Sequence, residues 1–170
     1  MKNWFVCSMM AVVLSASGLT TEAQAQRQSI VDVAIAANEA TGEFSTLIAA
    51  VVAADLVDTL DGFRRYTVFA PTDAAFAKLG LNAGNVVLAP KKELRNILLY
   101  HVTNGKRFSG SVLNARFLRM ANGETTRVSV SEAGAFINQS KLLAPDLIDI
   151  EASNGVIHVI DTVLAPSFLR

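Results

Sequence analysis

Two histidines are the side chains of this sequence best suited to chemistry near neutral pH. His101 ends the segment LLYH, and His158 lies inside the apolar run VIHVIDTV close to the C-terminus. Neither stands in an HxxxH or HExxH frame, and the only cysteine is Cys7. This spacing predicts no metal site, and we expect no cofactor.

Other catalytic motifs are not recognisable in the sequence. The segment FSGSV at residues 108–112 lacks the GxSxG frame of a hydrolase elbow. The segment LGLNAGN at residues 79–85 has neither the lysine nor the spacing of a phosphate-binding loop. We therefore predict a protein without catalytic residues, and a hydrolase is the alternative.

The apolar surroundings of both histidines favour a structural role. Residues 156–163 alternate between two mainly apolar faces, which is typical of a strand covered on both sides. A buried imidazole needs hydrogen-bond partners, because an unpaired buried polar group costs about 1 to 3 kcal/mol. We predict that His158 is buried in its neutral form and that His101 is packed where a helix passes into a strand. A binding role is the alternative for each.

Three further polar residues are predicted to be structural. Thr72 or Asp73 can cap a short helix that carries Phe76. Asp161 lies on the opposite face of its strand from His158, and we expect it to anchor a hydrogen bond at the edge of a sheet.

The elements that position these residues are segregated along the chain. Apolar residues at helical spacing predict four helices, at residues 30–37, 44–60, 73–79 and 91–101. A capping box of Ser29 and Asp32 opens the first of them. Strand-like segments begin at residue 66 and dominate after residue 106. Early helices and late strands indicate an α+β fold with a largely antiparallel sheet.

The composition suits one globular domain. The chain has 170 residues, of which 51% are hydrophobic and 18% charged, so disorder is excluded for the chain as a whole. Lysine plus arginine equals aspartate plus glutamate, so the net charge favours neither a nucleic-acid partner nor an anionic membrane.

The N-terminal segment resembles a signal peptide. Lys2 precedes the apolar run WFVCSMMAVVL, and the small-residue pattern AQA ends at Ala25. We predict a signal peptide at residues 1–25, one domain at residues 26–170, and no membrane span. Cleavage removes Cys7, so the mature chain has no disulfide, which favours bacterial export to the periplasm or the cell exterior.

Three segments together resemble the fasciclin (FAS1) domain family. They are YTVFAPTDAAFAKL at residues 66–79, LLYHV at residues 98–102 and NGVIHVIDTVLAP at residues 154–166, in the family's order and spacing. The resemblance covers residues 29–168. It implies a wedge or β-sandwich of about seven mainly antiparallel strands with a cluster of helices. It also implies cell adhesion through a cell-surface or matrix protein or glycan, without catalysis.

The resemblance also implies candidate interaction residues. Tyr100 and His101 match a tyrosine-histidine motif proposed as a contact in animal members, which requires an exposed edge of the tyrosine. Asp149 and Ile150 match the aspartate-isoleucine pair of adhesive relatives, although Glu151 follows where the animal motif has an apolar residue. A solvated strand end is the alternative for this pair.

A different class of function stays open beside adhesion. It is a periplasmic, stress-associated domain that holds a small apolar molecule or a glycan between helices and sheet. Arg64 and Arg65 could attract anionic glycans, or could merely solubilise the surface. A single adhesion domain gains avidity only when it is clustered, so we also expect weak self-association.

Overall fold

The computed structural model describes residues 28–143 and 149–166, and the predicted signal peptide lies outside them. The helices are α2 (Ile30–Thr41), α3 (Ser45–Ala53), α4 (Val57–Asp61), α5 (Asp73–Ala77), the 3-10 helix η1 (Val86–Leu88), α6 (Lys91–Tyr100) and α7 (Ser109–Asn114). The strands are β1 (Tyr66–Pro71), β2 (Val102–Asn104), β3 (Phe117–Arg119), β4 (Thr125–Ser131), β5 (Gly134–Ile137), β6 (Ser140–Lys141), β7 (Ile150–Ala152) and β8 (Gly155–Ile160).

The strands form two four-stranded sheets. The central sheet has the order β2-β1-β8-β7, and the second sheet has the order β3-β4-β5-β6. Strands β1 and β8 pair in parallel, whereas the other pairs are antiparallel. The predicted α+β class is confirmed. The exception to the antiparallel pattern lies at the centre, where every residue of β1 and β8 is buried, as is usual for parallel strands.

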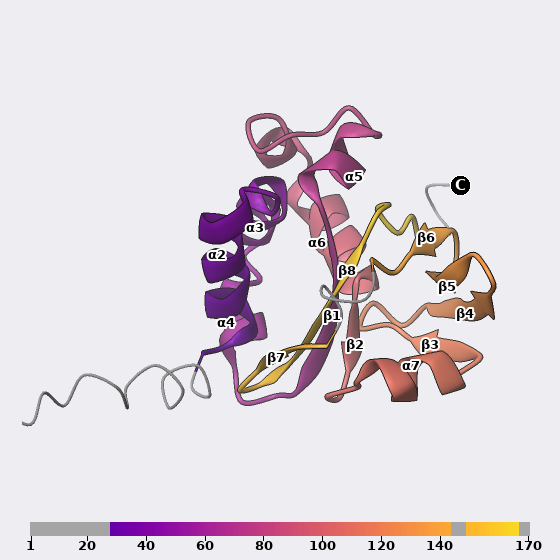
Figure 1. Cartoon of the computed structure of the whole chain (residues 1–170). Coiled ribbons are helices and arrows are strands. Elements are labelled where there is room, and N and C mark those ends of the chain that lie inside the picture. Colours follow the sequence, from indigo (N-terminus) through magenta and orange to yellow (C-terminus); the bar gives the residue numbers. More distant parts are fainter. Residues whose placement is uncertain (1–27, 144–148, 167–170) are drawn as a thin grey trace, which may run out of the picture.

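The central sheet separates two layers (Figure 1). Helices α2, α3 and α4 lie on one side of it, and the second sheet with α7 lies on the other. Alternate residues of β1 and β8 serve the two sides. Val68 and Ile157 belong to the core beneath the helices, while Phe69 and Ile160 belong to the core between the sheets.

Helix α2 is fixed at its N-terminal end. The predicted capping box is present, with Ser29 Oγ accepting a hydrogen bond from the Asp32 N–H and the Asp32 carboxylate accepting from the Ser29 N–H. The N–H of Ile30 donates to Asn154 Oδ1 at 2.9 Å. Gly155 follows, and a side chain there would collide with the backbone of Tyr66 and with Ile30. Glycine is therefore required where α2 meets the central sheet.

The helix predicted at residues 44–60 is wrong as a single element. The chain forms α3 and α4 instead, and Asp55 between them has a left-handed backbone with φ 57°. Leu56 and Leu60 are nevertheless buried on the same side, so the apolar stripe continues across the break. The periodicity of the sequence therefore conceals the change of direction.

Helix α7 was not expected, because helical spacing ends before residue 106. Only Val112 of its six residues is buried, so the segment carries almost no apolar stripe. Its first N–H is instead bound by a carboxylate from a distant part of the chain, Asp149.

Candidate functional site

His158 lies on β8 and is 1% exposed. Its Nε2 donates to the carbonyl of Arg107 at 2.9 Å, and its Nδ1 accepts from the backbone N–H of Asp149 at 3.2 Å. Its ring stacks on Phe69 with the centroids 5.7 Å apart. Burial lowers the pKa of His158, opposed by the Arg107 carbonyl and by the Asp149 carboxylate. The ring is therefore a neutral bridge between three separate backbone segments.

Asp149 supports the same bridge from outside the strand. Its backbone is left-handed, with φ 63°. Its two carboxylate oxygens accept hydrogen bonds from the N–H and the hydroxyl of Ser109, and its Oδ1 lies 3.8 Å from His158 Nδ1. A carboxylate at the start of a helix is favourable because of the free N–H groups there. The carboxylate that sequence comparison suggests for docking is thus already engaged within the domain.

Ile150 begins β7 and pairs with Ile157 of β8. Its side chain is half-buried and packs against the core beneath the helices. Asp149 and Ile150 are adjacent but point their side chains to different neighbours, one to α7 and the other to α2 and the sheet. Their role in recognition stays a prediction.

His101 follows α6 and is 2% exposed. Its Nδ1 donates to the carbonyl of Ile97 at 2.8 Å, and its Nε2 accepts from the backbone N–H of Leu164 at 2.8 Å. Burial lowers the pKa of His101 to about 4, with the Ile97 carbonyl opposing the shift. This imidazole ties the end of α6 to the segment that follows β8.

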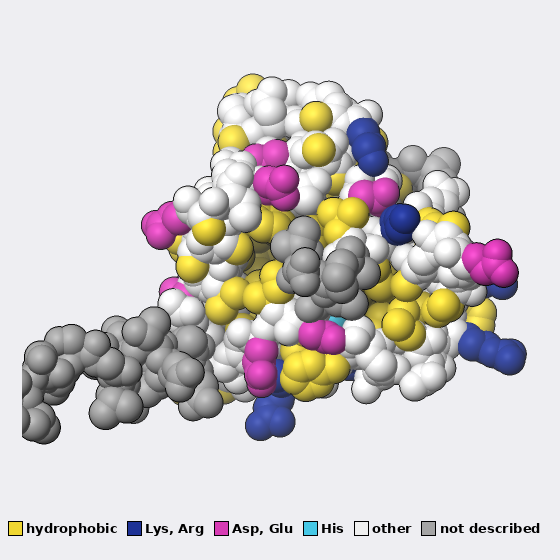
Figure 2. Space-filling view, in the orientation of Figure 1, with side chains coloured by type: hydrophobic (Ala, Val, Ile, Leu, Met, Phe, Trp, Pro, Cys, Tyr) yellow, Lys and Arg dark blue, Asp and Glu magenta, His cyan; other side chains and the backbone are white. Residues whose placement is uncertain are grey.

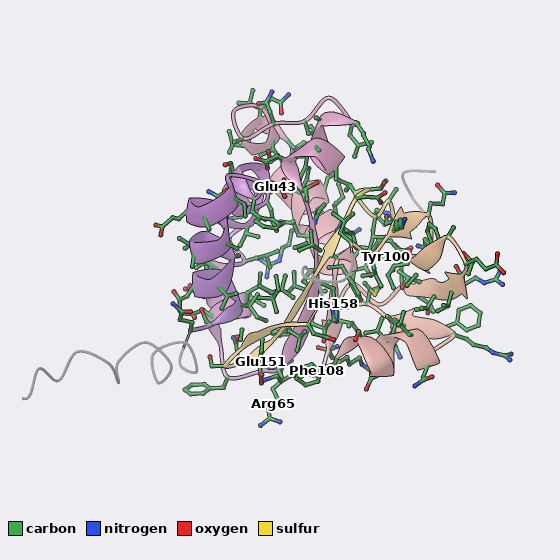
Figure 3. The ribbon with its side chains drawn as sticks, viewed as in Figure 1. Glu43, Arg65, Tyr100, Phe108, Glu151 and His158 are labelled. Atoms are coloured by element: carbon green, nitrogen blue, oxygen red, sulfur yellow. The ribbon has the colours of Figure 1, made fainter. Side chains whose placement is uncertain are left out.

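Tyr100 is buried as well, with 3% of its surface exposed. Its hydroxyl accepts a hydrogen bond from Asn138 Nδ2 at 3.0 Å. Figure 3 shows Tyr100 between the central strands and the second sheet. The exposed tyrosine edge that a recognition role requires is therefore absent from this conformation.

Thr72 and Asp73 divide the capping between two helices. Thr72 Oγ1 accepts from the Ala75 N–H and caps α5, whereas Asp73 Oδ1 accepts from the N–H of Thr46 in the first turn of α3. Of the two caps predicted for this helix, Thr72 is confirmed, whereas Asp73 caps a different helix. The folded chain brings α3 to Asp73, because the carbonyl of Glu43 just before α3 accepts from the Asp73 N–H.

Asp161 anchors the far end of β8. Its Oδ1 accepts from the backbone N–H of Lys141 at 2.8 Å, and its own N–H donates to the carbonyl of the same residue. The predicted hydrogen bond at the sheet edge is therefore present, and it joins β8 to β6 of the second sheet.

An exposed surface that sequence reasoning did not assemble lies where three loops meet. We call it the loop end and define it by residues 62–65, 105–109 and 153–154. The Gly105 N–H donates to the Arg65 carbonyl at 2.8 Å, which joins the first two loops. Phe63 is fully exposed, and Lys106 Nζ lies 5.7 Å from the ring centre of the exposed Phe108. The β1–β2 pairing brings these residues together.

The loop end carries charge beside its aromatic rings. Arg64, Arg65 and Arg107 are exposed, and Lys106 pairs with Glu151 at 2.5 Å. Figure 3 places Arg65, Phe108 and Glu151 close together below the central sheet. Apolar, basic and acidic side chains meet at the same edge in Figure 2. This surface can offer stacking and charge-assisted hydrogen bonds to a partner.

Within residues 28–143 and 149–166, no group of three or more His, Cys, Asp or Glu side chains could hold a metal ion. No helix in those ranges is long and apolar enough to cross a bilayer.

The chain is similar to known proteins over most of its length. The fasciclin domain model matches residues 42–166. Protein sll1483 of Synechocystis is 37% identical over 95% of this chain and 91% of its own length. The transforming growth factor-beta-induced protein ig-h3 of Sus scrofa is 40% identical over 72% of this chain, which spans 18% of that protein.

A solved structure has the same fold. It is a FAS1 domain pair from the insect cell adhesion molecule fasciclin I, with a TM-score of 0.62 and 18% identity over 83% of this chain and 52% of that one. The central sheet, the helical layer and the three sequence segments thus agree with one assignment, and the chain belongs to the fasciclin (FAS1) domain family.

Proposed function

We propose that this chain is an exported, non-catalytic fasciclin domain that mediates cell adhesion by binding a cell-surface or matrix protein or glycan. Family membership supports the class of function, since the solved structure with this fold comes from a cell adhesion molecule. The predicted leader at residues 1–25 supports a place in the periplasm or outside the cell.

The loop end is the observation that carries this proposal. It presents a fully exposed aromatic ring, Phe63, beside the exposed cations Arg64 and Arg65. A free aromatic side chain and a planar guanidinium group are the residue types that dominate binding energy in protein interfaces. The tyrosine-histidine motif is buried, so a partner that docks without unfolding the domain needs another surface.

The partner that fits the loop end is anionic. Guanidinium groups bind carboxylate and sulfate-like groups with two parallel hydrogen bonds, and aromatic rings stack on sugar or side-chain faces. An acidic protein surface or an acidic glycan therefore matches it. Weak self-association would add avidity, because a single domain has one binding site and several associated copies can bind the same surface together.

The test is binding of the exported protein to intact cells and to immobilised matrix proteins and acidic glycans. Phe63→Ser with Arg65→Ser should weaken saturable binding about tenfold or more. The matched control is Phe117→Ser with Arg119→Ser, which removes an exposed ring and an exposed cation from the second sheet. Equal losses in both variants, or no saturable binding by the unmodified protein, would contradict the proposal.

A third variant tests the pair suggested by the family motif. Asp149→Asn with Ile150→Ala removes the charge and the aliphatic group while an amide oxygen can still accept from the Ser109 N–H. Loss of binding in this variant alone would move the contact from the loop end to the start of β7.

A further inference from the structure

An apolar cavity lies between the helical layer and the central sheet. Its volume is about 150 Å³, and thirteen side chains from α2, α3, α4, β1 and β8 line it. Every one of them is Ala, Val, Leu or Ile, so the wall offers no hydrogen-bond donor or acceptor from a side chain. Figure 2 shows apolar side chains gathered between the helical layer and the centre of the molecule.

The cavity exists because α2 carries small residues where it faces the sheet. Ala34 and Ala37 occupy the inner face one turn after Ile30 and Val33, which fill the core. Hydrogen bonds hold both ends of α2. Ile30 is bound to Asn154 at one end, and at the other the N–H of Phe44 donates to Asn38 Oδ1 at 2.9 Å.

The cavity is open to solvent. Ile35 of α2 and Val52 of α3 line it and are 40% and 61% exposed. A second, much smaller void of about 10 Å³ adjoins it and shares Ala34 and Ala70. Ile150 of β7 lines this smaller void and not the cavity.

The chemistry of the wall selects the occupant. An apolar wall offers water no hydrogen-bond partner, and a cavity of about 150 Å³ has room for a hydrocarbon group of about six carbons. A glycan is a poor match, because its hydroxyl groups would lose water without gaining partners. The side chains that line an empty cavity lack van der Waals partners on that side. An apolar occupant supplies these contacts and therefore stabilises the fold.

We propose that this cavity is a binding site for the hydrocarbon end of an uncharged or amphiphilic small molecule, with any polar head group left at the mouth beside Ile35 and Val52. The site goes beyond the adhesion function proposed above and uses none of the residues of the loop end. About six carbons of the ligand are enclosed, and the rest of the molecule lies outside.

The test uses the chain exported and processed by a bacterial host, and a series of straight-chain alcohols from butanol to dodecanol. Calorimetry should show affinity rising about fourfold for each added methylene. The rise should stop after about six carbons, when the cavity is full. A disaccharide should give no binding. Affinity that does not depend on chain length would overturn the proposal.

A cavity-filling variant links the binding to this site. Ala34→Leu should lower the affinity for hexanol at least tenfold, because the new side chain occupies the ligand's place. Ala36→Leu makes the same change on the exposed side of α2 and should leave the affinity unchanged. Should Ala34→Leu fail to fold, Ala70→Val narrows the cavity from the sheet. Equal affinity in the filled and control variants would contradict the assignment.

Two further measurements identify the source of the ligand and test whether the cavity is independent of the adhesion function. Organic extraction of the purified protein should release the ligand, and mass spectrometry should identify it. A phospholipid would mean that the bound hydrocarbon comes from a membrane, and any other hydrophobic molecule would mean a free ligand. Cell binding should be unaffected by Ala34→Leu. Suppose that this variant loses cell binding and that the unmodified protein binds no alcohol. The cavity would then hold an apolar side chain of the adhesion partner, and the proposal would be overturned.

Discussion

The regions around His101 and His158 use the same side chain in opposite orientations. His101 donates from Nδ1 to a carbonyl four residues earlier and accepts at Nε2 from the segment after β8. His158 donates from Nε2 to the loop before α7 and accepts at Nδ1 from the residue before β7. In both regions one ring nitrogen faces a carbonyl and the other an N–H, which only a neutral imidazole can satisfy.

The difference between the two regions is the neighbouring charge. A carboxylate, that of Asp149, lies 3.8 Å from His158 Nδ1, whereas only the Ile97 carbonyl opposes the effect of burial on His101. A nearby negative charge stabilises the imidazolium form. The comparison teaches that both histidines are held inside the fold by backbone hydrogen bonds, and that the His158 region is the one more easily changed by acid.

The largest effect is expected from His101→Ala. The change leaves a cavity and strips the Leu164 N–H of its partner, so the free energy of unfolding should fall by about 4 kcal/mol. Urea denaturation at pH 7.5 measures it. A loss below about 1 kcal/mol would mean that the ring is not a bridge.

The dependence of stability on pH should be nearly as large. The pKa of His101 is lowered to about 4 in the folded state, against about 6.5 in the unfolded chain. Below pH 6.5 the unfolded chain binds a proton that the folded one does not, so stability present above pH 6.5 falls as the pH drops toward 4.

Between pH 7.5 and 4.5 this one group should remove about 2 to 3 kcal/mol of stability. The His101→Gln variant has no titrating group at this position. Its free energy of unfolding should therefore fall by about 2 to 3 kcal/mol less than that of the unmodified protein over the same pH range. Parallel stability curves for the two proteins would contradict a neutral buried ring.

A smaller effect is expected at Asp149. Asp149→Ala removes the carboxylate that accepts hydrogen bonds from Ser109 at the start of α7. It also places alanine at a positive φ, which alanine adopts unfavourably. The free energy of unfolding should therefore fall by about 2 kcal/mol. Asp149→Asn keeps an acceptor and tolerates the left-handed backbone, and should cost less than half as much. Equal losses for the two would show that Ser109 does not depend on this side chain.

The smallest effect is expected from Phe69→Leu. It removes the ring that stacks on His158 but keeps most of the buried volume, so the cost should be about 1 kcal/mol. The Phe69 N–H donates to the His101 carbonyl, but the Phe69 ring stacks on His158. The ring resonances of His158 should therefore shift in the NMR spectrum much more than those of His101. Equal shifts of both rings would mean that the Phe69 ring does not act on His158 alone.

Local patterns in the sequence predicted the parts of the fold that local contacts determine. The capping box at Ser29 has its partner, Asp32, only three residues away, and it is present. The burial of His158 followed from the apolar residues on either side of it. Both features can be inferred from neighbouring residues in the sequence.

The parts that could not be predicted depend on distant residues. Asp73 caps a helix that begins 28 positions earlier, and the carboxylate of Asp149 binds Ser109, 40 positions away in the sequence. The loop end exists only because β1 pairs with β2. The cavity depends on small residues in both of its walls, Ala34 of α2 and Ala70 of β1, and an alanine at either position gives no signal in the sequence.

Imidazole nitrogen NMR at pH 7 tests the central claim, that the two histidines are neutral bridges of opposite orientation. A long-range nitrogen-proton correlation spectrum of the labelled protein identifies the protonated nitrogen of each ring. His101 should carry its proton on Nδ1 and His158 on Nε2, and acid should protonate His158 first. The same tautomer at both positions, or a cationic ring at pH 7, would contradict the account.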